Sequence, residues 1–328
     1  MNWFLDTKFG QMFLAIIAIA VIVGVLLGLA SLADRLKGRG RNVFSVAVFV
    51  LPALGLLLMA LIYPALGTVK NSFFDRFSTQ FVGLENFTWI FTDADSLRAF
   101  LNTAVWVLLV PLLSTGIGML YALLIDGKKF EKVAKSLLFM PMAISFVGAG
   151  IIWRFMYEYR GSAQSQRGLL NAIIVALGGE PVRFLQDSPL NTLFIIVVMI
   201  WVQAGFAMVL ISAAIKAIPT DIVEAAKLDG VSPLSMFTKI TVPTIRPTLV
   251  VVYTTITIAT LKVFDITQTM TGAKFQTQVL ANQMYDQAFT FLNAGRGSAT
   301  AVIIFVLVIP IVIFNTRQML KNKEVRGQ

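Results

Sequence analysis

The chain has 328 residues, of which 57% are hydrophobic and only 13% are charged, and its mean hydropathy is +0.80. A soluble globule of this size needs more polar surface, so the composition predicts a protein embedded in a bilayer. The chain lacks Cys and His, which excludes disulfides, thiolate and imidazole metal sites and a Ser-His-Asp triad; neither a metal site nor a catalytic residue is predicted. Basic cytoplasmic loops explain the formal charge of +10, and no nucleic-acid partner is expected.

Apolar runs near the roughly 20 residues needed to cross about 30 Å of hydrocarbon occur seven times. In chain order they occupy residues 12–33, 43–69, 99–125, 135–157, 189–215, 247–269 and 298–316. The first is longer than a signal-peptide core, and its basic residues follow it in DRLKGRGR instead of preceding it. It is therefore predicted to be a retained span. The predicted fold class is all-α, a bundle of seven transmembrane helices.

The connections between these runs differ in basic content. Residues 34–42, 126–135, 216–247 and 317–328 hold 16 of the 27 Lys and Arg, whereas the longer connections that alternate with them hold nine. Cytoplasmic loops of membrane proteins carry the excess of Lys and Arg. The first set is therefore predicted to be cytoplasmic, with the amino terminus outside and the carboxyl terminus inside.

The polar stretch IPTDIVEAAKLDGVSPLSMFTKITVPTIRP, residues 218–247, predicts a helix, a sharp turn and a second helix. Asp221 and Glu224 have the spacing of an N-cap residue and its N3 carboxylate, so the first helix is predicted over residues 222–229. Gly230 stands where a left-handed C-terminal cap is expected. Ser232 and Pro233 then begin the second helix as N-cap and first-turn proline.

Polar side chains inside the predicted spans are candidates for a hydrophilic path, because charge in hydrocarbon is costly and usually faces a cavity or a partner. Gln203 lies in the fifth run. The sixth run includes Thr254, Thr255, Thr257 and Thr260 together with Lys262, which on a helix can pair with Asp265 three residues later. Two interpretations stay open: these groups satisfy one another and hold helices together, or they line a path.

Two other classes of membrane protein fit the sequence less well. A membrane enzyme needs clustered acids or metal ligands, but carboxylates such as Asp75 and Glu158 are scattered in loops. A secondary transporter usually shows two related halves, which are not evident here. The chain also lacks G-x-x-x-x-G-K-[ST], so it is not expected to hydrolyse ATP itself or to be an enzyme.

The stretch 218–247 also carries a longer pattern. Glu224-Ala225-Ala226, three residues, Gly230, nine residues and then Ile240-Thr241-Val242-Pro243 resemble the EAA signature of ABC importer permeases, E-A-A-x3-G-x9-I-x-L-P. The spacing is complete, and the single departure is Val242 in place of the usual leucine.

Other stretches are similar to carbohydrate permeases of the maltose-importer type, and the general run of the chain resembles α-glucoside permeases. They are NTAVW at 102–106, FEKVAKSLLFMPMAISFVGAGIIWRFMY at 130–157, GLLN at 168–171, LKVFD at 261–265 and AGRGSATAVIIF at 294–305. The resemblance covers most of residues 43–315. It implies a permease domain over 43–328 with the loop 218–247 on its cytoplasmic side. An additional span and a basic loop over 1–42 precede that domain.

The same resemblance implies the partners. They are a second, homologous permease that forms a heterodimer with this chain, two copies of an ATP-binding subunit, an extracytoplasmic solute-binding protein, the sugar and the lipid of the bacterial cytoplasmic membrane. No cofactor is expected on this chain, since ATP and Mg belong to the partner ATPase. The expected substrate is an α-linked di- or oligosaccharide, and the alternative is an ABC permease for a non-sugar solute.

Two groups of site residues follow from the resemblance. In the first, a short helix couples the permease to the ATPase, and the implied residues are Glu224, Ala225, Ala226, Asp229, Gly230 and Pro243. In the second, sugar contacts lie in the fifth and sixth spans near mid-bilayer, and the implied residues are Gln203, Phe206, Thr255, Ala259, Lys262 and Asp265.

Overall fold

The computed structural model describes residues 7–33, 39–161 and 164–325. Within these ranges the chain is helical, with one isolated bridge between Phe74 and Phe81 and no strand. The chain divides into two compact units, residues 1–68 and 69–328. The predicted all-α class is confirmed for the described residues.

The first unit consists of long apolar helices. Helix α2 (Lys8–Ala33) packs against α3 (Arg39–Leu57), which continues without a break through the π-helical turn η1 (Leu58–Ile62) into α4 (Tyr63–Asn71). Many of the described large apolar side chains of these helices are exposed, as suits helices that face lipid. The first two predicted runs therefore form helices of spanning length.

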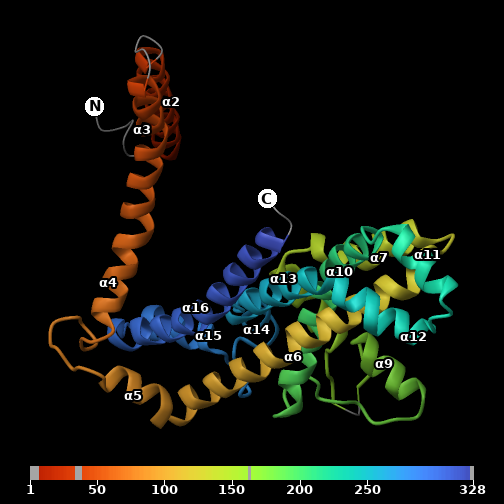
Figure 1. Ribbon diagram of the computed structural model, residues 1–328. Coiled ribbons are helices and arrows are strands. Elements are labelled where there is room, and N and C mark those ends of the chain that lie inside the picture. The colour runs from red at the N-terminus through yellow and green to blue at the C-terminus, as the bar shows by residue number, and fades with distance from the viewer. Residues whose placement is uncertain (1–6, 34–38, 162–163, 326–328) are drawn as a thin grey trace. The chain divides into compact units, whose positions relative to one another are not determined.

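The second unit contains the remaining helices, which Figure 1 shows from α5 in orange to α16 in blue. Their bounds are α5 (Glu85–Thr92), α6 (Ala94–Ile125), α7 (Glu131–Phe139), η2 (Met140–Ala143), α8 (Phe146–Met156), α9 (Leu169–Ala176), α10 (Leu190–Lys216), α11 (Thr220–Leu228), α12 (Pro233–Ser235), η3 (Met236–Thr241), α13 (Val242–Leu261), α14 (Asp265–Thr271), α15 (Leu280–Tyr285), η4 (Asp286–Thr290) and α16 (Ala294–Val325).

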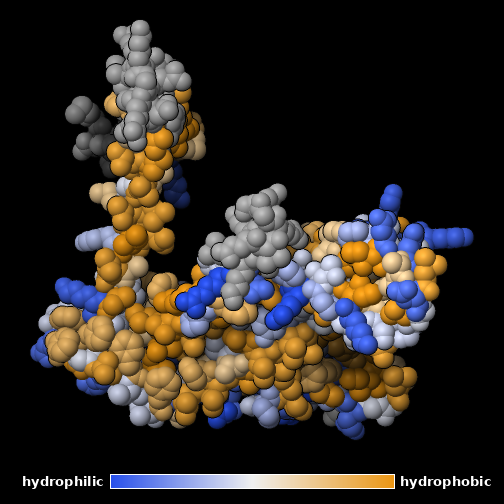
Figure 2. Space-filling model, viewed as in Figure 1, coloured by the Kyte–Doolittle hydropathy of each residue, from blue (hydrophilic) through white to orange (hydrophobic). Residues whose placement is uncertain are grey.

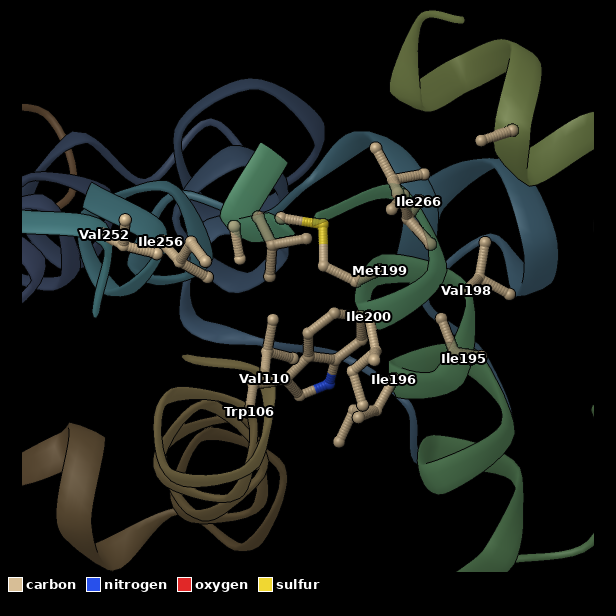
Figure 3. Packing of buried hydrophobic residues seen from close by; sticks show 14 of the residues in the cluster. Trp106, Val110, Ile195, Ile196, Val198, Met199, Ile200, Val252, Ile256 and Ile266 are labelled. Atoms are coloured by element: carbon tan, nitrogen blue, oxygen red, sulfur yellow. The ribbon is translucent and has the colours of Figure 1, made fainter. Parts of the chain in front are cut away.

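The core of this unit lies where α10 packs against α6 and α13. Trp106 and Val110 of α6 meet Ile196 and Met199 of α10, and Ile256 approaches from α13 (Figure 3). The described side chains of α10 are mostly buried, which is why its sequence is apolar on every face. Helix α10 is therefore the central helix of the second unit.

Close approach of α6 to α10 depends on Gly118. A Cβ atom at this position would lie 2.5 Å from the Cβ of Ala207 and 2.7 Å from the backbone nitrogen of Met208. Small residues allow helix backbones in membranes to pack this closely. Gly118 thus sets the separation between the two helices that form most of the core.

The predicted single span over 135–157 is wrong in detail. Helices α7 with η2 and α8 form a pair bent by 101°. Pro141 lies in the last turn before the bend, and the side chain of Ser145 caps α8 by accepting a hydrogen bond of 3.0 Å from the backbone N–H of Gly148. The segment is therefore apolar enough to enter the membrane but is not one straight helix.

The predicted run over 247–269 also differs from the structure. Helix α13 ends at Leu261, residues 262–264 interrupt it, and α14 begins at Asp265. Towards its start, α13 continues η3 and α12, so that Pro233–Leu261 is one uninterrupted helical segment of 29 residues. The spanning helix is displaced towards residue 233 compared with the prediction.

Six helices in the described part of the chain are long and apolar enough to cross a membrane, and the number is seven if the bent pair counts as one span. Figure 2 shows wide apolar areas on the viewed face of the second unit. Exposed leucines of α6, including Leu101, Leu108 and Leu112, are of the kind that lipid or a partner covers. The polytopic membrane character is therefore confirmed at this level.

Candidate functional site

A cavity of about 390 Å³ lies beside the central helix. Its wall comes from three separate segments: the bend between η2 and α8, the middle of α10 and the second half of α13. The lining residues are Met142, Ile144, Ser145, Phe146, Val202, Gln203, Phe206, Thr255, Ile256 and Ala259. Four of the six predicted path residues, those on α10 and α13, are thus brought together at one place.

Gln203 is the most informative of these residues. Its side chain is only 8% exposed, and its amide forms no hydrogen bond with another part of the described protein. Buried amides are nearly always hydrogen-bonded, because an unpaired one costs free energy. The amide of Gln203 is therefore available to a molecule in the cavity.

The threonines of α13 divide into two kinds. The hydroxyls of Thr254, Thr257 and Thr260 donate to the carbonyls of Val250, Tyr253 and Ile256, at 2.7–2.8 Å. These three are satisfied within their own helix, which matches the structural interpretation. Thr255 is different: its side chain is exposed, makes no such bond and lines the cavity.

Lys262 and Asp265 lie outside this cavity. Both are exposed, and they do not form an ion pair with each other. The expected i, i+3 pairing fails because it requires a continuous helix, whereas α13 ends before Lys262 and Asp265 begins α14. The two residues mark the break between these helices.

Sequence reasoning missed the contribution of the bend to the cavity. Ser145 and Phe146 line it only because the chain turns sharply after Ala143. Non-helical backbone at membrane depth occurs where it lines a cavity or is buried in protein. The signal was present in MPMAIS, where a proline is followed by a serine with the character of an N-cap.

The polar stretch after α10 forms the predicted helix-turn-helix. Helix α11 covers Thr220–Leu228, close to the predicted 222–229, but Pro219 rather than Asp221 occupies the N-cap position, so the capping box of Asp221 and Glu224 is not formed. At the other end Gly230 has a φ of +70°. The N–H groups of Val231 and Gly230 donate to the carbonyls of Ala226 and Lys227, both at 3.1 Å. This is a Schellman cap, so the predicted left-handed cap is confirmed.

The residues of the EAA pattern are mostly at the surface. Glu224, Ala225, Asp229 and Gly230 are exposed, whereas Ala226 is buried. The apolar side chains of Ile222, Leu228 and Leu234 are also exposed, and Leu228 is 89% exposed.

The second half of the pattern continues into the long helical segment. The Ser232 hydroxyl accepts a hydrogen bond of 3.3 Å from the N–H of Ser235, and Pro233 begins the helix, as predicted. Pro243 lies in the first turn of α13, within the same segment. The helix-turn-helix is thus continuous with the helix that carries Thr255 and Ala259.

An ion-pair network ties the start of α7 to the end of α10. Lys216 lies 2.5 Å from the carboxylate of Glu131 and 3.3 Å from that of Asp126. Lys135 contacts Glu131 at 2.7 Å and also donates to the hydroxyl of Ser212. Only the pair of Glu131 and Lys135 was recognisable as an i, i+4 pair, since Lys216 is distant in sequence.

The comparisons with known proteins agree on one family. The osmoprotective compounds uptake permease protein GgtC of Synechocystis is 47% identical over 279 residues, which are 85% of this chain and 100% of that protein. The alpha-glucoside transport system permease protein AglF of Rhizobium meliloti is 48% identical over 271 residues, 82% of this chain and 81% of that protein.

A chain of the bacterial alginate ABC transporter, solved in complex with an alginate pentasaccharide-bound periplasmic protein, has a TM-score of 0.71 and 24% identity, covering 82% of this chain and 92% of that one. This likeness shows a shared fold. The sequence pattern of the family described as "Binding-protein-dependent transport system inner membrane component" matches residues 114–323, and the protein belongs to this family of ABC importer permeases.

Proposed function

We propose that the protein is the permease subunit of an ABC importer that moves a neutral sugar, an α-linked di- or oligosaccharide, across the bacterial cytoplasmic membrane by alternating access. The observation that carries this proposal is Gln203, a residue only 8% exposed whose unpaired side-chain amide lines a cavity within the membrane helices. Sugar hydroxyls both donate to and accept from an amide. The names of the relatives that take an alpha-glucoside, trehalose and maltose, or lactose support this substrate class.

The sugar path includes the cavity and continues past it. Gln203 and Thr255 supply hydrogen-bonding groups, Phe206 supplies an apolar ring face and Ala259 leaves room beside them. Lys262 and Asp265, exposed at the break after α13, extend the polar lining towards the outer side.

The chain crosses the membrane seven times, with the amino terminus outside and the carboxyl terminus in the cytoplasm. The asymmetry of Lys and Arg among the connections supports this orientation. Residues 1–42 form the additional span and its basic loop, and residues 43–328 form the permease domain. The loop 218–247 then faces the cytoplasm.

Helix α11 couples the permease to an ATP-binding subunit. Exposed Ile222 and Leu228 form an apolar surface that a groove on the partner covers, and the exposed carboxylate of Glu224 is placed for a basic side chain there. The complex contains two such subunits, which bind ATP and Mg²⁺, together with a second permease and an extracytoplasmic binding protein. The chain itself holds no cofactor and no ATPase site.

Uptake by the complete importer in lipid vesicles tests this function. We expect Gln203→Leu to lower the uptake of radiolabelled maltose or trehalose at least about tenfold while the complex assembles normally, because an amide that faces the sugar is lost. Gln80→Leu, an exposed glutamine in a loop, is the control and should transport normally. Full uptake by an assembled Gln203→Leu complex would overturn the proposed path.

A further inference from the structure

A second and larger polar cavity, of about 510 Å³, is formed by other segments of the second unit. Its wall is formed by α5, the start of α6, the loop before α15, the π-helical turn η4 and the start of α16. None of its lining residues belongs to the cavity that contains Gln203. Its volume falls within the roughly 300–1,000 Å³ usual for small-molecule sites.

Backbone contacts hold the wall of this outer cavity in place. The guanidinium of Arg76 donates to the carbonyls of Phe291 and Leu292, at 2.5 and 3.2 Å, and the N–H of Ala294 donates back to the carbonyl of Arg76 at 3.0 Å. The loop before α5 and the turn before α16 are thereby joined. The cavity is therefore a built feature of the fold.

Gln287 presents an unpaired side-chain amide to the cavity. Its side chain is only 7% exposed, lines the cavity and makes no hydrogen bond within the described protein. Because the amide is open to the cavity and has no protein partner, it can bond with water or with a ligand there. The amide of Gln287 therefore points to an occupant of the cavity.

The charges around the cavity favour a neutral occupant. Three carboxylates, those of Asp93, Asp95 and Asp286, and the two guanidinium groups of Arg76 and Arg296 line the cavity, so that its wall carries charges of both signs with a small negative excess. A small anion or cation would meet like charge on one side, whereas hydroxyl groups can donate to carboxylates and accept from guanidinium groups. Amides of Gln278 and Gln283 add further donors and acceptors; the full lining also includes Trp89, Ala273, Phe291 and Asn293.

An aromatic ring completes the wall. Trp89 lines the cavity, and the guanidinium of Arg296 lies over its ring, 4.5 Å from the centroid. A pyranose carries hydroxyl groups around its edge and C–H groups on its faces. The polar groups of this wall can bond with the hydroxyls, and an aromatic side chain offers apolar surface to the C–H groups.

We propose that this outer cavity is a second binding site for a short neutral oligosaccharide, with Gln287 and Asp95 bonding to its hydroxyls. Only the location of this site, at the outer mouth of the importer, rests on the proposed function. There it would hold sugar before the sugar enters the path at Gln203.

Binding to the assembled importer without its binding protein tests this site. The full complex in nanodiscs is titrated with maltose and with trehalose, and sugar contact is followed by saturation-transfer NMR. We expect Gln287→Met and Asp95→Asn each to weaken binding about three- to tenfold, the effect of losing one hydrogen bond. Gln80→Met, an exposed glutamine outside the cavity, should bind like the wild type. Unchanged thermal unfolding of each variant shows that the fold is kept.

Each other outcome is decisive. Unchanged binding in both Gln287→Met and Asp95→Asn, absence of binding of both sugars to the wild type, or equal competition by inorganic phosphate would overturn the site.

Gln203→Leu separates the two proposals. If it abolishes uptake while sugar binding persists and depends on Gln287, both proposals stand. If Gln203→Leu loses all sugar binding whereas Gln287→Met binds sugar as the wild type does, the proposed path stands and the outer site fails. If Gln203→Leu transports normally while binding depends on Gln287, the path fails and the outer site stands.

Discussion

The ammonium of Lys216 lies 2.5 Å from the carboxylate of Glu131, although the two residues are 85 positions apart in the chain. Lys216 is the last residue of α10, four positions before α11 begins, and Glu131 is the first residue of α7. The pair therefore connects the proposed coupling helix to the segment that leads into the bend. We expect movement of α11 to reach this contact through the short connection at residues 217–219.

Replacing Lys216 with Met should loosen this connection. Because the Lys216 side chain is 50% exposed and solvent screens its ion pairs, we expect little loss of stability. The larger effect is expected in coupling: ATP hydrolysis continues while sugar uptake per ATP falls several-fold. Simultaneous measurement of both rates in vesicles checks this. Lys216→Arg should restore coupling. Lys128→Met, at an exposed lysine between α6 and α7 for which the structure shows no ion pair, should not disturb it. Normal coupling in Lys216→Met contradicts the prediction.

Replacing Gly230 with Ala should strain the cap of α11. Gly230 has a φ of +70° and open space around it, so the cost comes from the backbone, about 1 kcal/mol. We expect sugar-stimulated ATPase activity to fall, since the coupling helix loses its fixed end. Gly178→Ala is a matched control, because Gly178 has a φ of +83° and caps α9 through the same pair of hydrogen bonds. Equal loss of coupling in both variants would show that the effect is general instability.

Thr255 and Thr257 provide a test of the path within one helix. Thr255→Val removes a hydroxyl that faces the cavity, whereas Thr257→Val removes one that donates to its own helix at 2.7 Å. We expect Thr255→Val to raise the apparent KM for sugar uptake by about three- to tenfold. Thr257→Val should leave KM unchanged. The prediction fails if the two variants have the same KM.

Gly118→Ala should weaken the packing of α6 on α10. The new methyl group would overlap Ala207, and overpacking of this kind costs about 1–3 kcal/mol. We expect a lower thermal unfolding temperature and poorer assembly of the complex. Gly116→Ala, two residues earlier on the same helix with nothing within 4 Å, should match the wild type. A wild-type unfolding temperature for Gly118→Ala would contradict the close approach of the two helices.

Asp75 should make the loop before α5 sensitive to acid. Backbone N–H groups of Gln80 and Thr79 donate to its carboxylate at 2.9 and 2.7 Å and hold its pKa below the ordinary value of 3.8. A lowered pKa in the folded state means that the stabilisation is complete above pH 3.8 and disappears as the pH falls through the lower, folded-state pKa.

Hydrogen exchange of residues 75–82, corrected for the intrinsic rate, measures this effect. We expect the wild type to be better protected than Asp75→Asn at pH 6 and the difference to vanish in strong acid. A difference that persists unchanged below the folded-state pKa would show that the carboxylate charge is not its cause.

The sequence predicted the elements whose cause is local. Long apolar runs predicted α10 to within one residue at each end and α6 to its last residue, although α6 begins five residues before the run. The turn chemistry of Gly230, Ser232 and Pro233 was confirmed. Gln203, Phe206, Thr255 and Ala259 meet at one cavity, and their contact with sugar stays a prediction.

Features that depend on tertiary contacts were not predictable in the same way. Hydropathy does not distinguish a straight span from one bent by 101°, since both need the same apolar composition. Nor does it show which threonine bonds to its own helix: Thr255 and Thr257 differ only in the face that they present. The contact of Lys216 with Glu131 needed the three-dimensional arrangement of α7 and α10.

The uninterrupted segment Pro233–Leu261 has a mechanical consequence. With about 1.5 Å of rise per residue, its 29 residues form a rod roughly 43 Å long, with the Ser232 cap at one end and the break at Lys262 at the other. A tilt of about 10° around one end of the helix would move the other end by about 7 Å, which is more than the length of a hydrogen bond to a sugar hydroxyl. We therefore expect this rod to act as a lever arm, through which a small rotation at the Ser232 end would shift the part of the cavity wall that Thr255 and Ala259 form.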